Sequence, residues 1–343
     1  MPLPERAPSK LGDRRGSVGK NCSVSIVIRA YNEEPHINRL LRGILRQHMR
    51  DVEIILVDSG STDDTVAMAK RYPVRILSIS PEDFSFGRSL NIGCAKAQGE
   101  FIVIVSAHAY PVYANWLEKL IAPFSDPQVA LAYGKQRGCA TTKFAEHQVF
   151  RKWFPDERRV SGKDPFCNNA NAAIRRELWE TNPYDEALTG LEDIAWAQSL
   201  IERGHKIAYV PAAEVIHVHN ESSRQIYNRY RREAIALQTI FPQQSLTFRG
   251  FVGLLLPNIC RDLVQSWRAG LLFSRIFQIM SFRLMQFWGT YSGFQQLDPV
   301  TAKLRKKFYY PRRLRRTLSL TNGNDAQLRS MYSGTKADEE ADE

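Results

Sequence analysis

The sequence is poor in cysteine, and this scarcity excludes two kinds of small structural site. The chain of 343 residues has five cysteines, and no two of them have the Cys-x-x-Cys spacing. Neither a zinc site built on paired cysteines nor a disulfide framework is therefore expected. Scattered free thiols are typical of a reducing compartment, so we expect the protein in the cytoplasm.

Long uninterrupted apolar runs are also absent. No stretch approaches the ~18–20 residues that a membrane-spanning helix needs. Residues 1–20 are polar and basic without an apolar segment, so we expect residues 1–21 to form a disordered leader and not a secretory signal. No glycine-rich loop with a lysine follows the first predicted strand, which disfavours a nucleotidyltransferase on a similar sheet.

The net charge of +11 is concentrated near the end of the chain. Residues 303–316 hold eight Lys and Arg and no acid, whereas residues 317–343 hold two basic and six acidic residues. We predict a basic and then acidic disordered tail over residues 301–343. An anionic membrane surface or nucleic acid would suit the basic run. We favour the membrane and expect no nucleic acid.

Apolar strands and amphipathic helices alternate through the first hundred residues. Buried strands are predicted over residues 23–30, 52–57, 74–79 and 101–105, with helices between them. This alternation predicts an α/β fold with a mostly parallel sheet covered on both faces. The pattern loosens after Pro111, and residues 137–170 are predicted to be irregular. We place the catalytic domain at residues 22–240.

The most informative single feature is a strand that ends in an acid. The aliphatic run Ile54 to Val57 stops at Asp58, and a turn of small polar residues follows. Ligands of open α/β sheets bind at the carboxyl ends of the strands, so Asp58 is placed to hold the base or ribose of a nucleotide. Taken alone, a capped strand-to-helix turn explains these residues equally well.

Three further polar clusters lie where predicted strands end or helices begin. They are Arg29-Ala30-Tyr31-Asn32-Glu33 after the first strand, Phe86 to Gly93 together with Ser106-Ala107-His108 after the fourth strand, and Gly190 to Trp196. With the turn at Asp58, these clusters resemble family 2 glycosyltransferases, an inverting group with a glycosyltransferase A-type fold. The resemblance covers about residues 23–219, and the motifs stand in the family's order.

The resemblance implies transfer of a sugar from a nucleotide-diphosphate donor to a hydroxyl acceptor, in cell-surface polysaccharide or glycolipid synthesis. Asp193 is the expected catalytic base, because a carboxylate can take the proton of the acceptor hydroxyl. Expected donor contacts are Ala30, Tyr31, Glu33, Asp58, Arg88, Asn91, Ser106, Ala107 and His108. Expected acceptor contacts are Asn169, Asn171, Glu192 and Trp196. Structural alternatives are a helix cap for Asp193, a surface salt bridge for Arg88, and core packing for aromatic residues.

One motif departs from the family. Most members carry Asp-x-Asp, which holds a divalent cation on the diphosphate, where this chain has Ser106-Ala107-His108. We expect Mn²⁺ or Mg²⁺, with His108 and His219 as ligands and His217 as a further candidate; Mg²⁺ is less suited because it prefers oxygen. The alternatives are a diphosphate held by Arg88 without metal, or an impaired transferase that serves as a nucleotide-binding or membrane scaffold.

Residues 251–289, the middle of a region that we bound at residues 241–300, are apolar but interrupted by arginines. Arg261, Arg268 and Arg275 are seven residues apart and Arg283 follows after eight, so on one helix they would share a face. We predict an amphipathic, membrane-associating helical region. The alternative is a helix packed on the catalytic domain with its arginines in solvent. We therefore expect a lipid-linked or polysaccharide acceptor and a peripheral position on the inner face of the plasma membrane of a bacterium.

Overall fold

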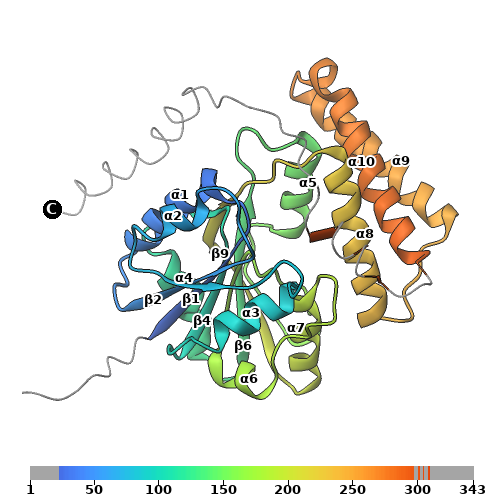
Figure 1. The fold of residues 1–343 in the computed structure, drawn as a ribbon. Coiled ribbons are helices and arrows are strands. Elements are labelled where there is room, and N and C mark those ends of the chain that lie inside the picture. Colours follow the sequence, from blue (N-terminus) through green and yellow to red (C-terminus); the bar gives the residue numbers. More distant parts are fainter. Residues whose placement is uncertain (1–22, 297–299, 302–303, 305–307, 310–343) are drawn as a thin grey trace, which may run out of the picture. The chain divides into compact units, whose positions relative to one another are not determined.

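A mixed β-sheet forms the centre of the protein (Figure 1). The computed structural model describes residues 23–296, 300–301, 304 and 308–309. Within this part the sheet has nine strands in the order β3-β2-β1-β4-β8-β6-β9-β5, and β7 pairs with β9. The strands are β1 (Val24–Ala30), β2 (Val52–Asp58), β3 (Arg75–Ser78), β4 (Phe101–Ser106), β5 (Ala109–Pro111), β6 (Val129–Arg137), β7 (Arg159–Ser161), β8 (Asn171–Arg175) and β9 (Lys206–His217).

Helices cover both faces of this sheet. They are α1 (Glu34–Leu45), α2 (Thr65–Ala69), α3 (Phe86–Cys94), α4 (Trp116–Ile121), α5 (Phe144–Trp153), α6 (Arg176–Thr181) and α7 (Glu192–Glu202). Three longer helices follow, α8 (Ser223–Ile240), α9 (Phe248–Arg268) and α10 (Leu272–Phe294), and α10 packs on α5, α8 and α9. The buried side chains of β1 alternate between two cores: Ile26 and Ile28 join α1 and α4, while Val27 joins α3 and α7. The predicted α/β sheet with helices on both faces is confirmed.

The register of the parallel strands aligns three of the predicted clusters. β1 lies between β2 and β4, with Ala30 opposite Asp58 and Arg29 opposite Ser106. We call the carboxyl ends of these strands, with the loops that follow them, the strand-end rim. Antiparallel β8 is inserted between β4 and β6, so the sheet is mixed beyond its parallel half.

The prediction that residues 137–170 are irregular is wrong, because this stretch contains α5. Its buried residues are Ala145, Glu146 and Phe150. A carboxylate at a buried position breaks the apolar periodicity by which an amphipathic helix is detected. Glu146 tolerates burial because Arg229 of α8 lies 2.8 Å away and neutralises its charge.

The predicted single arginine face is also wrong, because the region is a helical hairpin. The chain leaves α9 through Gly270, whose φ of 70° is typical of a residue that follows a helix end. Arg261 and Arg268 therefore lie on α9 and Arg275 on α10. Arg283 is buried and pairs with Asp262 of α9, with Nε 2.7 Å from Oδ2.

Backbone contact without intervening side chains joins α10 to α8. A Cβ at Gly289 would lie 2.5 Å from the carbonyl oxygen of Tyr227, and one at Gly293 would lie 2.5 Å from that of Arg231. Only glycine permits this approach. The helical hairpin and the predicted catalytic domain thus belong to one compact unit. In the part of the chain that is described, no helix has the length and apolar character to cross a membrane.

Two residues near the end of the described chain are packed against this unit. Phe308 and Tyr309 are buried, and the Tyr309 ring lies 5.0 Å from Phe84 and 5.5 Å from Phe86. These two residues of the predicted disordered tail are therefore ordered. The predicted leader, residues 1–21, and most of the tail lie outside the described residues.

We expect Asp262→Ala to destabilise the protein by about 3–5 kcal/mol, because it leaves the Arg283 charge buried without its partner. The measurement is the free energy of unfolding in urea. The matched control is Asp262→Leu combined with Arg283→Met, which removes both charges and is expected to cost much less. Equal losses in the two variants would contradict this assignment of the ion pair.

Candidate active site

Asp58 ends β2 at the strand-end rim with one oxygen satisfied and one free. Its Oδ2 accepts hydrogen bonds of 3.1 Å from the amides of Gly60 and Ser61. Its Oδ1 is buried and has no hydrogen-bond partner among the described residues. A buried carboxylate oxygen without a partner is costly unless a ligand donates to it. This geometry suits the N–H or O–H groups of a bound nucleoside.

The loop after β1 is tied to this turn and to the next strand. Asn32, at a positive φ of 54°, accepts a hydrogen bond of 2.8 Å from the Thr62 amide. The carboxylate of Glu33 lies 2.8 Å from Nδ1 of His108. The Glu33 side chain therefore orients His108, and its contact with the nucleotide stays a prediction. Ala30 is buried opposite Asp58, and Tyr31 is half-buried at the same rim.

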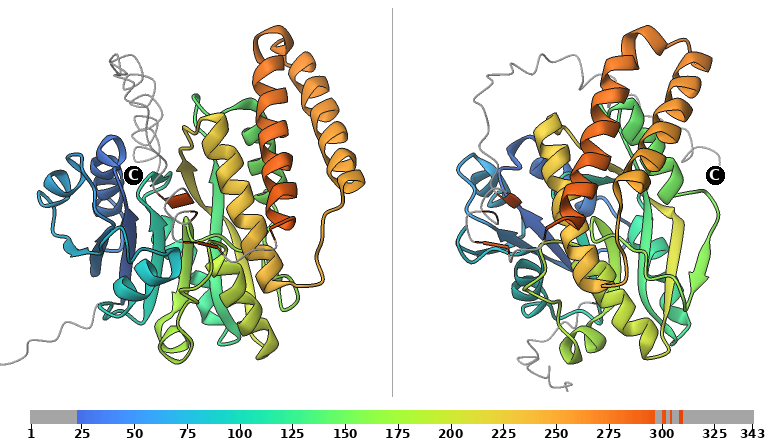
Figure 2. Two further views of the ribbon diagram at one scale, coloured as in Figure 1. Left: turned by 45° about the vertical axis from the view of Figure 1, so that its right-hand side comes forward. Right: turned by 90° about the vertical axis from the view of Figure 1, so that its right-hand side faces the viewer.

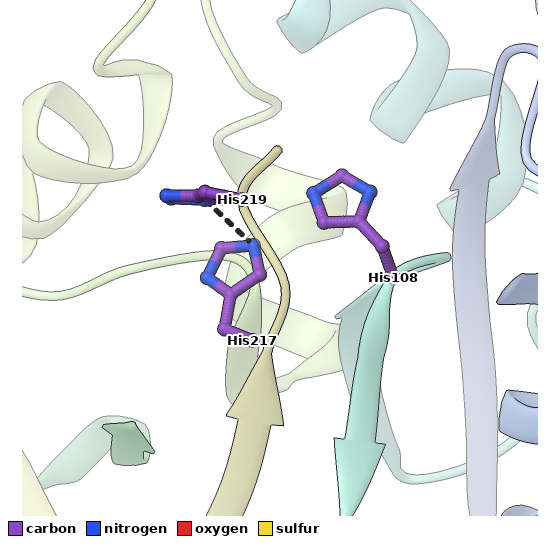
Figure 3. Close-up of side chains that lie close together, drawn as sticks. All are labelled: His108, His217 and His219. Atoms are coloured by element: carbon purple, nitrogen blue, oxygen red, sulfur yellow. Dashed lines mark hydrogen bonds between the residues drawn. The ribbon is translucent and has the colours of Figure 1, made fainter. Parts of the chain in front are cut away.

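Three histidines gather at the ends of β4 and β9 (Figure 3). His108, His217 and His219 each bring a ring nitrogen within 4.8 Å of the other two. We call them the histidine cluster. His217 Nε2 and His219 Nε2 face one another at 3.1 Å. Before His108, Ala107 is fully buried and Ser106 Oγ lies 3.2 Å from His108 Nε2.

The protonation of His217 follows from a chain of hydrogen bonds that starts at the backbone. The Ala170 amide can only donate, so the Asn168 atom that it meets at 2.9 Å is an oxygen. That oxygen accepts from the Gln136 amide nitrogen at 3.0 Å, which turns the Gln136 oxygen toward His217 Nδ1 at 2.7 Å. His217 Nδ1 therefore carries the hydrogen. Burial, followed by the charges of neighbouring groups, holds the pKa of His217 well below its usual value, so the Nε2 lone pair is free.

His219, like His217, directs its Nδ1 toward an oxygen acceptor. Its Nδ1 lies 2.7 Å from the carboxylate of Glu146 and donates to it. Burial would raise the pKa of Glu146, but His219 and Arg229 outweigh it and lower the pKa to about 2. With His217 Nδ1 and His219 Nδ1 both donating, two Nε2 lone pairs would meet at 3.1 Å. Such an approach is stable only with a proton or a cation between the two nitrogens.

The donor set of the histidine cluster suits a divalent transition metal. Each of the three rings faces an oxygen acceptor with Nδ1: Glu33 for His108, Gln136 for His217 and Glu146 for His219. Partners of this kind orient metal-binding imidazoles and fix the tautomer. Burial would lower the pKa of His108, but Glu33 raises it overall. Imidazole nitrogens suit transition metals such as Zn²⁺ far better than Mg²⁺, and among the divalent transition metals Mn²⁺ binds such a donor set most weakly.

The predicted base lies at the start of α7, where the backbone is unusual. Leu191 caps this helix at a left-handed φ of 56°, and it directly precedes the acid pair, Glu192 and Asp193. Burial, followed by the charge of Glu192, raises the pKa of Asp193 to about 7. A base whose pKa lies near the working pH is well matched to proton transfer.

The acid pair is joined to the strand-end rim and to the histidine cluster. Arg29 Nη1, from β1, lies 3.2 Å from the Glu192 carboxylate. The backbone amide of Asn169 donates a hydrogen bond of 3.0 Å to Asp193. The neighbouring residue, Asn168, accepts a hydrogen bond from Gln136, and Gln136 accepts one from His217. The acid pair and the histidines therefore share one polar network. Asn169 Oδ1 is buried without a described partner, so it remains a predicted acceptor contact.

Three other predicted site residues are structural instead. Asn171 is fully buried, and it accepts from Trp116 Nε1 while donating to two backbone carbonyls. Both polar atoms of Asn91 bind the segment around Tyr184. Trp196 is a core residue whose Nε1 donates to the Asn182 carbonyl. Arg88 is exposed on the first turn of α3, and its contact with the diphosphate stays a prediction.

Sequence reasoning missed four residues of this network. Arg29 and Arg232 of α8 both place a guanidinium over the Phe86 ring, at 4.7 Å and 4.4 Å. Gln136 near the end of β6 could have been found by the same strand-end rule that selected Asp58. No sequence signal marks Glu146 or Arg232, because neither residue follows a strand or belongs to a recognisable motif.

The sequence of this chain is similar to those of known glycosyltransferases. The family model described as glycosyl transferase family 2 matches residues 25–181. The O-antigen chain rhamnosyltransferase WbaN of Salmonella anatum is 30% identical over 220 residues, which are 61% of this chain and 70% of that protein. The rhamnosyltransferase RfbN of Salmonella typhimurium is 28% identical over 219 residues, 60% of this chain and 70% of that protein.

One solved structure supports the fold. The mannosyltransferase PcManGT of Pyrobaculum calidifontis, in complex with GDP-Man and Mn²⁺, superposes with a TM-score of 0.52 at 19% identity, over 85% of this chain and 88% of that one. Fold and site together define an enzyme of the glycosyltransferase A-type, which uses a nucleotide sugar. The chain belongs to glycosyltransferase family 2, and the predicted family is confirmed.

The pH dependence of the rate should report Asp193. Because the base acts as a carboxylate, we expect kcat/KM to fall as the pH drops below about 7. Glu192→Gln removes a negative charge that raises this pKa, so the fall should move to lower pH. The measurement is the pH profile of kcat/KM. An unchanged profile in Glu192→Gln would show that another group limits the rate.

Gln136→Met tests the orientation of His217. The variant removes the acceptor for Nδ1–H, and the loss of such a partner typically weakens metal binding by about 10–100-fold. Titration calorimetry with Mn²⁺ alone measures the change. Gln198→Met, on α7 and outside the network, is the matched control and should bind like the unaltered protein. Equal Mn²⁺ affinity in both variants would contradict the inferred tautomer.

Proposed function

We propose that this glycosyltransferase transfers a rhamnose-type 6-deoxyhexose from a nucleoside-diphosphate donor to a hydroxyl of a saccharide acceptor, in the assembly of a cell-surface polysaccharide. The choice of sugar is supported by the two rhamnosyltransferases that share 30% and 28% identity with more than half of this chain. The observation that carries the chemistry is Asp193, a buried acid with a pKa of about 7 in one polar network with the histidine cluster.

On the donor side, Asp58 holds the nucleoside through its free oxygen, and Arg88 is placed to approach the diphosphate from α3. The histidine cluster would hold a divalent cation, and the mannosyltransferase structure that contains GDP-Man and Mn²⁺ supports Mn²⁺ as that cation. When bound, such a cation neutralises the charge that grows on the diphosphate as it leaves. Arg29 and Arg232 add fixed positive charge beside Phe86, on the side of the acid pair.

On the acceptor side, Asp193 takes the proton of the attacking hydroxyl. The hydroxyl oxygen forms a bond to the anomeric carbon while the bond from that carbon to the diphosphate oxygen breaks. The electron pair of the broken bond leaves with the diphosphate, and the configuration of the anomeric carbon inverts. Arg29 and Asn169 position the acid pair for this step, because each contacts a carboxylate of the pair.

We place the enzyme in the cytoplasm at the inner face of the plasma membrane, with a lipid-linked saccharide as acceptor. Free cysteines, of which Cys94 and Cys167 are buried, accord with a reducing compartment. The alternative of an impaired scaffold protein rested on Ser106 and His108 in place of Asp-x-Asp. The histidine cluster offers three nitrogen ligands where that motif offers carboxylates, so the altered motif does not by itself imply lost catalysis.

A donor screen combined with Asp193→Asn tests the proposal. With nucleoside-diphosphate sugars and Mn²⁺, we expect turnover with a rhamnose donor above that with hexose donors. Asp193→Asn should lower kcat by about 10²–10⁴-fold, since it removes the general base. Calorimetry with the nucleoside diphosphate controls for folding, because binding should persist in the variant. Full activity of Asp193→Asn would remove Asp193 as the base, and nucleotide binding without turnover of any donor would favour the scaffold.

A further inference from the structure

The exposed apolar surface of the protein is concentrated on one element. Of the fifteen large hydrophobic residues that are exposed in the described chain, eleven lie on α9, α10 and the turn between them. Exposed apolar residues scattered singly need no explanation, but a gathered set marks an interaction site. The two views of Figure 2 show α9 and α10 as a hairpin whose turn lies at the end away from the sheet.

The exposed face of α10 is a continuous apolar stripe. Its members recur at intervals of three and four residues and so share one side of the helix. They are Phe273, Phe277, Met280, Leu284 and Trp288. Exposure is highest nearest the turn, at 94% for Phe273 and 83% for Phe277, and falls to 41% for Trp288. Trp267, on the last turn of α9, is 68% exposed beside the same turn.

The exposed charges of the two helices, α9 and α10, are of one sign. Arg249, Arg261 and Arg268 are exposed on α9, and Arg275 is half-buried on α10. The one acid on the two helices is Asp262, which is buried and paired with Arg283. The surface therefore offers arginines and large apolar side chains with no carboxylate between them.

We propose that the α9–α10 hairpin inserts its apolar stripe into an anionic lipid bilayer, with the turn entering first. Trp and Phe side chains partition into the membrane interface, and arginines beside them bind lipid phosphates. A second copy of the chain fits less well. A two-fold interface places the same patch on both subunits, so neither subunit would bring an exposed acid from these helices to pair with the arginines.

The contacts of the α9–α10 hairpin with α5 place the proposed membrane-binding surface close to the histidine cluster. Gln278 of α10 accepts a hydrogen bond of 3.1 Å from the Phe144 amide, and Arg283 donates to the Ala145 carbonyl. The next residue, Glu146, holds His219. One turn of α5 thus separates the hairpin from the histidine cluster. The benefit for catalysis, access to a lipid-linked acceptor, rests on the proposed function, whereas lipid binding itself does not.

Co-sedimentation of the full chain with vesicles tests the proposal. We expect binding to vesicles of phosphatidylglycerol and phosphatidylethanolamine, and much weaker binding to phosphatidylcholine alone. Phe273→Glu should weaken binding by about tenfold or more, because it removes one inserted aromatic ring and adds a repelled charge. The matched control is Val160→Glu, an exposed apolar residue on β7 that is outside the hairpin, and it should bind normally.

Two further measurements separate insertion from other outcomes. Brominated lipids should quench tryptophan fluorescence, and Trp267→Phe should remove a large part of that quenching. Arg261→Gln combined with Arg268→Gln should weaken the preference for anionic vesicles, and an unchanged preference would show that these two arginines do not contact lipid. Light scattering of the protein without lipid reports a second copy: a dimer that Phe273→Glu dissociates, with no vesicle binding by the unaltered chain, would overturn the proposal.

Transfer to a water-soluble acceptor saccharide distinguishes this proposal from the proposed function. We expect Phe273→Glu to keep that activity while losing vesicle binding. Unaltered vesicle binding in Phe273→Glu overturns the membrane surface and leaves the enzyme assignment standing. Absence of transfer by the unaltered protein, with vesicle binding intact, overturns the proposed function alone.

Discussion

The orientation of one side-chain amide, that of Asn168, is the constraint on which the site depends. The Ala170 amide fixes the Asn168 oxygen, and this decides which end of Gln136 faces His217 and which nitrogen of that ring holds its hydrogen. The backbone amide of the next residue, Asn169, donates a hydrogen bond to the carboxylate of Asp193. A single short segment before β8 therefore orients a ring of the histidine cluster and the base together. The proposed mechanism needs both placed at once, and one short segment achieves this without a separate support for each.

Much of the fold and the position of the site could be predicted because parallel strands obey simple rules. Buried strands in α/β chains are nearly continuous apolar runs, and their carboxyl ends meet at one edge. Those rules located Asp58 and His108 at a common rim, as the register of β1 with β2 and β4 shows. The family resemblance added the expected role of Asp193 as the base, which no strand rule would have selected.

The rest could not be predicted, because a polar residue at a strand end can bind a ligand or hold the protein together. Asn171 and Asn91 lie in suitable motifs, yet their amides are fully used by internal partners such as Trp116 and Tyr184. Glu146 shows the opposite difficulty: it contributes to the site but could not be selected from the sequence. Its carboxylate occupies a buried helical position where sequence patterns predict an apolar residue. Only the three-dimensional neighbours of each group, Arg229 and His219 in the case of Glu146, decide between these roles.

The two close glycine contacts of α10 have a consequence for how much the sequence of this helix can vary. Backbone meets backbone at Gly289 and Gly293, so even a methyl group at either position would force α10 away from α8. The position of the exposed apolar stripe relative to α8 is thus set by two missing side chains. In a variant with a larger residue at either position, α10 would have to lie farther from α8, and α9, which packs on α10, would shift with it.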